Sequence, residues 1–552
     1  MARFNFCSYS YQSLSPNIDA EWSMNLYPEA VESPNGRSAV ALVPTDGLKL
    51  FTQLNSGFSA RGLFTFSGRT FTVLVDASNN LQLTEINFDG TTATRGNMGA
   101  AGANVPAIFA ANPTQLVVSM LGTGNVYVLS LATNAFTTVA LNASSVGYLD
   151  GFFVALIADT NSFQVSALED GTTWPGINTA TISEFPDPAV GMAINDRTIF
   201  FLGQKQSVPY YNSGALFPFV PVPGAFIEEG AGATYAITKL DNTFLFIGGN
   251  VDQGVGIAYR LNGYTSERIS NHPLETIWQS YPTIADAVGY TYQTRGHKFW
   301  HIYFPTANAS WRYDIATGSW CQVGSWNPVT GQFTAHKSQA HTFNFGMHLV
   351  ADPFSANIYS MSIANLTDNG APIRRVRRAP YIAKEHEEVF HRKLEVLCET
   401  GLPSNIPAAS PNPQAFNIAD STGVLWQVTI NDAGAMTVAA APAGQGATGN
   451  VVLADNVNQI TFWQLQVSVL GVLSGIQVQF GSARAAIFAM GTQPTLPNVL
   501  AMDTGLEVNQ AGVVSAVPPT AHLRAPQLEL RWSDDGGHTC LLYTSPSPRD
   551  CS

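Results

Sequence analysis

Charged residues are scarce in this sequence of 552 residues, where Lys, Arg, Asp and Glu together make up 12%, about half the share usual in globular proteins. Because such residues cover most helix surfaces, their scarcity argues against helical bundles, coiled coils and disorder. The 47 Gly and 32 Pro favour a turn-dense, all-β fold. The net charge of −13 excludes general attraction of nucleic acid. A surface with so little charge is typical of one that partners bury.

Long apolar runs and paired cysteines are also absent. The longest apolar run, around residues 467–476, is far below the roughly 20 residues that cross a bilayer. The N-terminus lacks the apolar segment of a secretory signal. The five cysteines show no zinc or redox spacing, so we expect free thiols and folding in a reducing cytoplasm; they are Cys7, Cys321, Cys398, Cys540 and Cys551.

Sequence signatures of enzymes are missing as well. There is no Walker loop, His-Glu-x-x-His motif, nucleophile elbow or EF-hand loop. The glycine-rich segment 248–256 is not followed by a helical pattern, and we interpret it as a hairpin turn. His386 and His391 lie near two glutamates, but their spacing suits neither one helix face nor one strand face. We therefore expect no enzyme activity, no catalytic residue, no cofactor and no bound metal.

What the sequence does contain is a repeat. Short β-branched and aromatic runs recur at intervals of 37 to 56 residues, beginning at Thr70, Gln115, Phe152, Thr198, Thr243, Phe299 and His348. Several are followed by a turn and a second strand with a tyrosine, namely Tyr127, Tyr259, Tyr313 and Tyr359. This period predicts an all-β fold, a β-propeller of six or seven blades. The alternative is a pair of β-sandwiches, whose turns recur every 8–12 residues or so.

The basic residues gather in one segment. Residues 374–393 hold seven of the 26 Lys and Arg and carry a net charge of +4. We interpret the four arginines of this segment as a possible docking patch, facing DNA or a protein partner; they are Arg374, Arg375, Arg377 and Arg378. A solvated surface edge is the equally weighted alternative.

These patterns divide the chain into seven parts. An N-terminal segment (1–45) precedes the propeller (46–373), which a basic segment with a closing strand (374–401) follows. A Pro-rich linker (402–413) leads to an additional small, sandwich-like β domain (414–525). A hairpin (526–539) comes next, and residues 540–552 read like a translated sequencing adaptor, so we expect an artefactual tail.

The predicted hairpin carries a specific motif. Residues 533–539 match the Asp-box pattern Ser-x-Asp-x-Gly-x-Thr, and a cysteine stands where a tryptophan normally follows. Such boxes close β-hairpins, so Ser533, Asp535 and Gly537 are interpreted as structural. Sialidases carry several boxes, together with an arginine triad and a Tyr/Glu pair that cannot be assembled from this sequence.

The order of the motifs resembles a known family. Asn25-Leu26-Tyr27-Pro28-Glu29 is similar to a signature of the tail accessory, packaged-DNA stabilisation, tail-hub or nozzle proteins of short-tailed double-stranded DNA phages. Further segments at residues 60–75, 165–187, 239–275 and 289–320 match in order, as do HRKLEVLCETG and RWSDDGGHT. The resemblance covers nearly all of residues 1–401 plus 527–539. It marks Gly296, His297 and Trp311 as further structural or family-defining positions.

Two departures from the family pattern stand out. Gly401 and Trp532 are 131 positions apart, whereas the equivalent segments lie close together in the family, so the β domain between them is interpreted as an insertion. The sequence also ends where family members continue past the Asp-box tryptophan.

The resemblance implies a structural virion protein of a short phage tail, made in the host bacterial cytoplasm. Its expected partners are copies of itself in a ring, commonly a hexamer, with portal, adaptor and other tail proteins. Such a ring closes the channel, retains packaged DNA and forms the conduit for ejection, while double-stranded DNA passes without sequence-specific binding. The alternative is a glycan-binding or glycan-cleaving, sialidase-like propeller, in which Trp426 or Trp463 of the inserted domain could hold a sugar.

Overall fold

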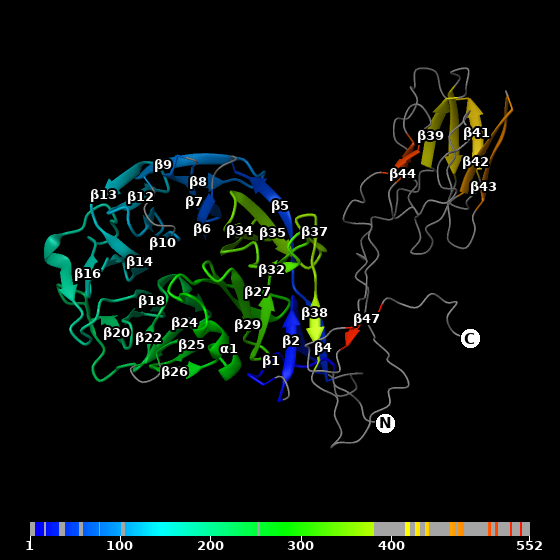
Figure 1. Ribbon diagram of the computed structural model, residues 1–552. Helices are drawn as coiled ribbons and strands as arrows, with labels where there is room; N and C mark the ends of the chain where they lie inside the picture. Colours follow the sequence, from blue (N-terminus) through cyan, green and yellow to red (C-terminus); the bar gives the residue numbers. More distant parts are fainter. Residues whose placement is uncertain are drawn as a thin grey trace. The chain divides into compact units, whose positions relative to one another are not determined.

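The structure of the protein is a computed structural model that is dominated by β-strands (Figure 1). It describes residues 6–379 except 16–17, 33–38, 55–58, 77, 101–104 and 251–253, and beyond residue 379 only nine strands. Contacts divide the chain into two units, Met1–Phe390 and His391–Ser552.

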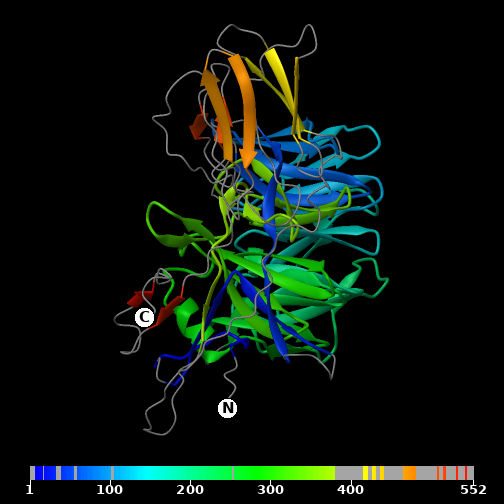
Figure 2. The ribbon, with the colours of Figure 1, turned by 90° about the vertical axis from the view of Figure 1, so that its right-hand side faces the viewer.

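The first unit is a β-propeller. Its described residues form seven sheets of four or more strands, and the innermost strands of successive sheets contact one another in a closed ring. Figure 1 shows these blades following one another from blue to green, and Figure 2 shows them from the side. The sequence left six or seven blades open, and the described residues form seven.

Six blades are continuous in sequence. Blade 1 comprises β6 (Ser59–Phe66), β7 (Arg69–Val75), β8 (Asn80–Ile86) and β9 (Thr92–Ala100). Blade 2 comprises β10 (Ile108–Ala111), β11 (Gln115–Ser119), β12 (Val126–Ser130) and β13 (Phe136–Val139). Blade 3 comprises β14 (Ala143–Leu149), β15 (Phe152–Ile157), β16 (Ser162–Val165) and β17 (Thr179–Thr181), the last preceded by the short helix η1 (Gly176–Asn178).

Blade 4 comprises β18 (Gly191–Asn195), β19 (Thr198–Leu202), β20 (Ser207–Asn212) and β21 (Phe219–Pro221). Blade 5 comprises β22 (Gly230–Ala231), β23 (Thr238–Leu240), β24 (Thr243–Asn250), β25 (Gly254–Asn262) and β26 (Thr265–Arg268), with η2 (Thr234–Ala236) between β22 and β23. Blade 6 comprises β27 (Val288–Thr294), β28 (His297–Phe304), β29 (Ala309–Asp314) and β30 (Ser319–Val323).

Blade 7 is closed by the N-terminal part of the chain. Its strands β33 (Ala340–Asn344), β34 (Met347–Ala351) and β35 (Asn357–Ser362) are completed by β5 (Gly47–Gln53), which pairs antiparallel with β35. The short strands β36 (Thr367–Asp368) and β37 (Ala371–Pro372) extend the same sheet. The first and last blades are thereby held next to each other by strand pairing.

The segments before and after the propeller extend blade 6. β2 (Ala20–Met24) pairs with β30, with β1 (Tyr11–Gln12) and with β38 (Val376–Arg378). β3 (Leu26–Ala30) pairs with β4 (Val40–Pro44), and β31 (Ser325–Asn327) pairs with β32 (Gln332–Thr334). Residues on both sides of the propeller therefore join one sheet.

The repeat predicted from the sequence is confirmed strand by strand. Each of the seven recurring runs forms the second strand of a blade: β7, β11, β15, β19, β24, β28 and β34. The four tyrosines that follow lie on the third strands β12, β25, β29 and β35. The glycine-rich segment joins β24 to β25 in an antiparallel hairpin, in which Asn250 pairs with Gly254.

The hydrophobic core lies between neighbouring blades. Between blades 3 and 4, the Phe163 and Phe201 rings stack with centroids 4.6 Å apart. The helix α1 (His272–Gln279) fills the space between blades 5 and 6, because its Trp278 is fully buried in their shared cluster. Asn271 caps this helix by accepting a hydrogen bond from the Leu274 amide.

The second unit is described only as paired strands. β39 (Gln414–Ala419), β40 (Leu425–Ile430) and β41 (Met436–Ala440) form one sheet, and β42 (Gln464–Leu470) pairs with β43 (Val472–Gln479). β44 (Leu506–Val508) pairs with β45 (Val514–Ala516), and β46 (Leu530–Trp532) with β47 (Leu541–Tyr543). Trp426 lies on β40, while Trp463, the linker and the side-chain packing expected of a sandwich lie outside the described residues.

Candidate functional site

The N-terminal Asn-Leu-Tyr-Pro-Glu motif lies where the propeller ring closes. Asn25 separates β2, which joins blade 6, from β3, which pairs with β4. Its φ of +57° is in the left-handed region, which asparagine tolerates better than most other residues. The chain changes direction there, and Asn25 is almost completely buried.

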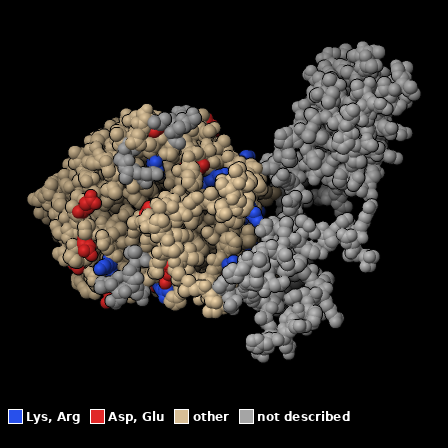
Figure 3. Space-filling view, in the orientation of Figure 1, with Lys and Arg blue, Asp and Glu red and all other residues tan. Residues whose placement is uncertain are grey.

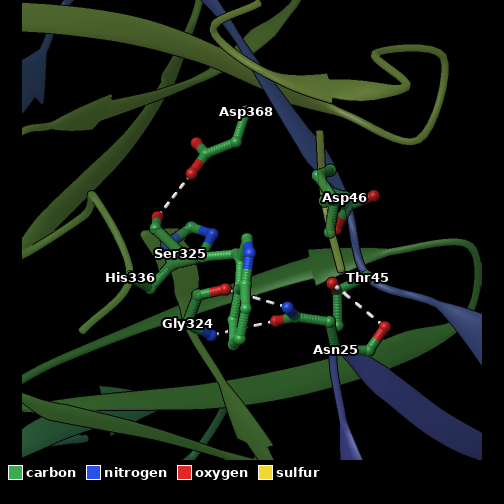
Figure 4. A pocket seen from close by; sticks show the side chains of 9 residues that line it. Asn25, Thr45, Asp46, Gly324, Ser325, His336 and Asp368 are labelled. Atoms are coloured by element: carbon green, nitrogen blue, oxygen red, sulfur yellow. Dashed lines mark hydrogen bonds between the residues drawn. The ribbon is translucent and has the colours of Figure 1, made fainter. Parts of the chain in front are cut away.

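Asn25 connects four segments through hydrogen bonds (Figure 4). Its Nδ2 donates to the carbonyl oxygens of Gly324 and Arg374, both at 2.8 Å, and its Oδ1 accepts from the Gly324 amide at 2.9 Å. Its backbone amide donates to the Gln322 carbonyl at 2.9 Å, and its carbonyl accepts from the Thr45 amide at 3.1 Å. One residue therefore ties the N-terminal segment to the end of blade 6, the start of β5 and the basic segment.

Tyr27 is the second buried residue of the motif. Its ring contacts those of His297 and Phe299 edge to face, each with centroids 5.1 Å apart. It belongs to the apolar cluster between blades 6 and 7, which includes Leu48 of β5. Among the described residues the hydroxyl has no hydrogen-bond partner, and burial raises the pKa of Tyr27 to about 12. Tyr27 therefore packs as an apolar side chain between blades 6 and 7, in the contact that we call the closing seam.

The other motif residues are less buried or lie at an edge. Leu26 is half-buried, Pro28 is buried and Glu29 is exposed, all on the two-stranded sheet of β3 and β4. Proline is tolerated on such an edge because the sheet does not need its missing amide donor.

The family-defining positions of the propeller lie on blade 6. Gly296, with φ +84°, forms the turn between β27 and β28. His297 follows it, and its Nδ1 lies 2.8 Å from Oδ2 of Asp314, with both side chains buried. Trp311 is buried and donates from Nε1 to the Tyr281 hydroxyl at 3.0 Å. These contacts are turn and core contacts within the described part of the chain.

The structure separates the four arginines of the predicted docking patch. Arg377 is turned inward: only 3% of its side chain is exposed, and it donates to Glu21 Oε1 at 2.9 Å and to Ser23 Oγ at 3.0 Å. The same guanidinium donates to the Phe6 carbonyl at 3.0 Å. It thereby fastens the N-terminal segment, and sequence reasoning gave no indication of this internal role.

The other three arginines are more accessible. Arg374 lies over the Trp326 ring at 4.1 Å, and Arg378 donates to the Ala20 carbonyl at 2.6 Å. Arg375 is exposed. Figure 3 shows that the visible face of the described residues is mostly uncharged, with scattered basic and acidic side chains.

A small pocket lies beside Asn25 (Figure 4). It is lined by Asn25, Thr45, Asp46, Gly324, Ser325, Trp326, His336, Asp368 and Ile373. Asp368 accepts a hydrogen bond from the Ser325 hydroxyl, while its Oδ1 has no partner among the described residues. Within residues 6–379, as far as they are described, no group of three or more His, Cys, Asp or Glu is arranged to hold a metal.

Several predicted positions lie outside the described residues. Ser533, Asp535 and Gly537 fall between β46 and β47, which pair antiparallel. The basic segment beyond residue 379, with His386 and His391, is also outside them. Conversely, sequence reasoning missed the buried Arg312 and Asp46. The signal for Arg312 was a charged residue in the middle of an aromatic strand, SWRYD.

The fold and this site define a class of protein, a β-propeller whose ring is closed by its own N-terminal strand and fixed by a buried asparagine motif. A sequence model described as Bacteriophage P22 Gp10, beta-propeller, matches residues 18–365, and the chain belongs to this phage stabilisation family. Membership assigns it a structural role in the phage tail. No helix among the described residues is long and apolar enough to cross a membrane.

Comparisons with curated proteins and with solved structures do not narrow the function further. A search of curated proteins found no match. Among solved structures, the N-terminal domain of Nup159 is similar with 10% identity and a TM-score of 0.37, over 62% of this chain and 98% of that one. The Neurospora crassa Pan2 WD40 domain is similar with 7% identity and a TM-score of 0.36, over 56% and 97%. We base no conclusion on similarities at this level.

Proposed function

We propose that this chain is a subunit of a ring in a short phage tail, below the portal and its adaptor. In this role it narrows or closes the channel, retains the packaged DNA and forms the conduit on ejection. The family match over residues 18–365 carries the proposal. The closure of blade 7 by β5 and the fastening of Asn25 to the end of blade 6 support it, because a channel component needs a propeller that stays closed.

The charge of the chain is compatible with this role. DNA that passes through a tube must not bind its wall, and strong phosphate binding needs clustered Lys and Arg. Six copies at −13 each would carry about −78, and an acidic wall would repel the duplex and leave it mobile. We therefore propose that acidic residues line the channel.

Docking on a neighbouring protein is assigned to the basic residues of the segment other than Arg377. Arg377 is fully engaged within the chain, so we assign the contact to Arg375 and to the basic residues between 384 and 393. A partner with an acidic surface would complement them.

Complementation of phage particles tests the function. DNA-filled heads that lack this chain should lose their DNA to added nuclease, and purified full-length chain should restore protection and infectivity. Electron microscopy of the restored particles should show a ring around a central channel. Heads that retain their DNA equally well without the chain would contradict the proposal.

The docking assignment has its own comparison. Arg375→Glu should reduce binding to heads, whereas Arg197→Glu is the matched control, because Arg197 is also exposed but lies on blade 4 between β18 and β19. Normal assembly of Arg375→Glu particles would remove Arg375 from the docking surface and leave the ring proposal standing.

A further inference from the structure

A buried cation lies in the middle of blade 6. Arg312 is on β29, and none of it is exposed to solvent. In the strand register it is opposite His301 of β28 on one side and Cys321 of β30 on the other, and His301 is opposite Tyr290 of β27. Directly opposite residues share a face of the sheet. A phenol, an imidazole, a guanidinium and a thiol therefore form one row, and Tyr290 stacks on His341 of blade 7.

Among the described residues, the guanidinium and the imidazole of this row have no acceptor in hydrogen-bonding geometry, whereas the Tyr290 hydroxyl lies 2.8 Å from the Ser338 hydroxyl. In the described part of the chain, none of Nε, Nη1 and Nη2 of Arg312 has a hydrogen-bond partner in bonding geometry, nor has either ring nitrogen of His301. Arginine stays protonated in proteins and only donates hydrogen bonds. Burial holds the pKa of His301 well below its usual range, so this imidazole is neutral and offers one N–H. Buried donors of this kind normally have a partner.

The buried carboxylates of this region are held by other residues. Asp46 accepts from the Tyr292 hydroxyl at 3.3 Å and from Arg295 at 3.4 Å. Asp314 is held by His297 at 2.8 Å. Arg312 instead has its Cζ 5.3 Å from the centre of the Tyr292 ring and 5.5 Å from that of Phe299. Ring faces attract a cation but accept no conventional N–H hydrogen bonds from it.

We propose that Arg312 and His301 form a binding site for a small inorganic anion of halide size. The guanidinium would donate two or more hydrogen bonds to it, and the protonated ring nitrogen of His301 would donate another. An anion fits better than water because it both accepts these bonds and neutralises a buried positive charge. Bound between blades 6 and 7, it would stabilise the closing seam.

Salt substitution tests this site in the full-length chain. The unfolding midpoint of the wild type should be about 3 °C higher in sodium chloride than in sodium gluconate of equal ionic strength, because a ligand that binds only the folded state stabilises it. Arg312→Met should abolish the difference. Arg197→Met, a change of the same chemistry at an exposed arginine, should preserve it.

A crystallographic measurement keeps the test decisive if Arg312→Met fails to fold. Wild-type crystals grown in bromide should give an anomalous peak within hydrogen-bond distance of the Arg312 guanidinium. Equal midpoints in the two salts, a chloride effect that survives in Arg312→Met, or a bromide map with only water beside Arg312 would each overturn the proposal.

Discussion

The side-chain amide of Asn25 and the backbone of Gly324 exchange two hydrogen bonds, one in each direction, at 2.8 and 2.9 Å. The amide thus pairs with a strand end as a peptide group would in an antiparallel sheet. Because Asn25 precedes β3 and Gly324 follows β30, this pair joins the start of the chain to the end of blade 6.

Asn25→Gly should lower the free energy of unfolding by roughly 2–4 kcal/mol, because three buried side-chain hydrogen bonds are lost while glycine keeps the positive φ. Asn25→Ala should cost about 1 kcal/mol more, since alanine also strains the left-handed backbone. Denaturant unfolding of both variants measures this. Asn369→Ala, at an exposed turn with φ +52°, is the control for backbone strain alone. Equal losses at positions 25 and 369 would contradict the bridging role.

Tyr27→Phe should leave stability unchanged or slightly raise it, because the buried hydroxyl has no hydrogen-bond partner in the part of the chain that the structure describes. Tyr27→Ala should cost about 3–5 kcal/mol, since it removes a ring packed on His297 and Phe299. The difference between the two variants in thermal or denaturant unfolding isolates the ring. A large loss in Tyr27→Phe would show that the hydroxyl has a partner in solution.

Arg377→Met should loosen the N-terminal segment without unfolding the blades. The change removes the hydrogen bonds to Glu21, Ser23 and the Phe6 carbonyl. Limited proteolysis followed by mass spectrometry should show faster cleavage within residues 6–24. Arg375→Met, two residues earlier and exposed, should be cleaved as slowly as the wild type, and equal cleavage of both variants would argue against the fastening role.

Acid should open the seam between blades 6 and 7. Burial lowers the pKa values of His336 and His341 to about 3, below the value near 6.5 of an unfolded histidine. The unfolded chain therefore binds more protons below pH 6.5. Stability that is present above this pH is lost as pH falls towards 3, by up to about 1.4 kcal/mol per pH unit for each histidine.

A variant isolates this contribution from those of the carboxylates. His336→Gln should flatten the dependence of the free energy of unfolding on pH between 6.5 and 3. His272→Gln changes an exposed histidine on α1 and should leave the slope as it is. Identical slopes in all three proteins would show that His336 is not kept neutral by burial.

The blades could be predicted from the sequence because each repeats a local pattern. The runs at Thr70 and Phe299 are recognisable without any long-range information, since alternation and turn residues mark each strand. The closing strand β5 could not be recognised, because its partner β35 lies some 300 residues later and pairing at that distance leaves no local signal. The burial of Arg377 could not be predicted either, because an arginine in a basic segment is expected to be exposed unless the residues that accept its hydrogen bonds are known.

The pairing of β5 with β35 also determines how late in synthesis the propeller can close. The ribosome must add about 304 residues between Gln53 and Asn357, which takes roughly 15–60 s at about 5–20 residues per second. Throughout that interval β5 has no partner, and an unpaired strand edge invites association with other nascent chains. The same strand pairing that stabilises the folded propeller therefore leaves each nascent chain prone to misassembly until its seventh blade has been synthesised.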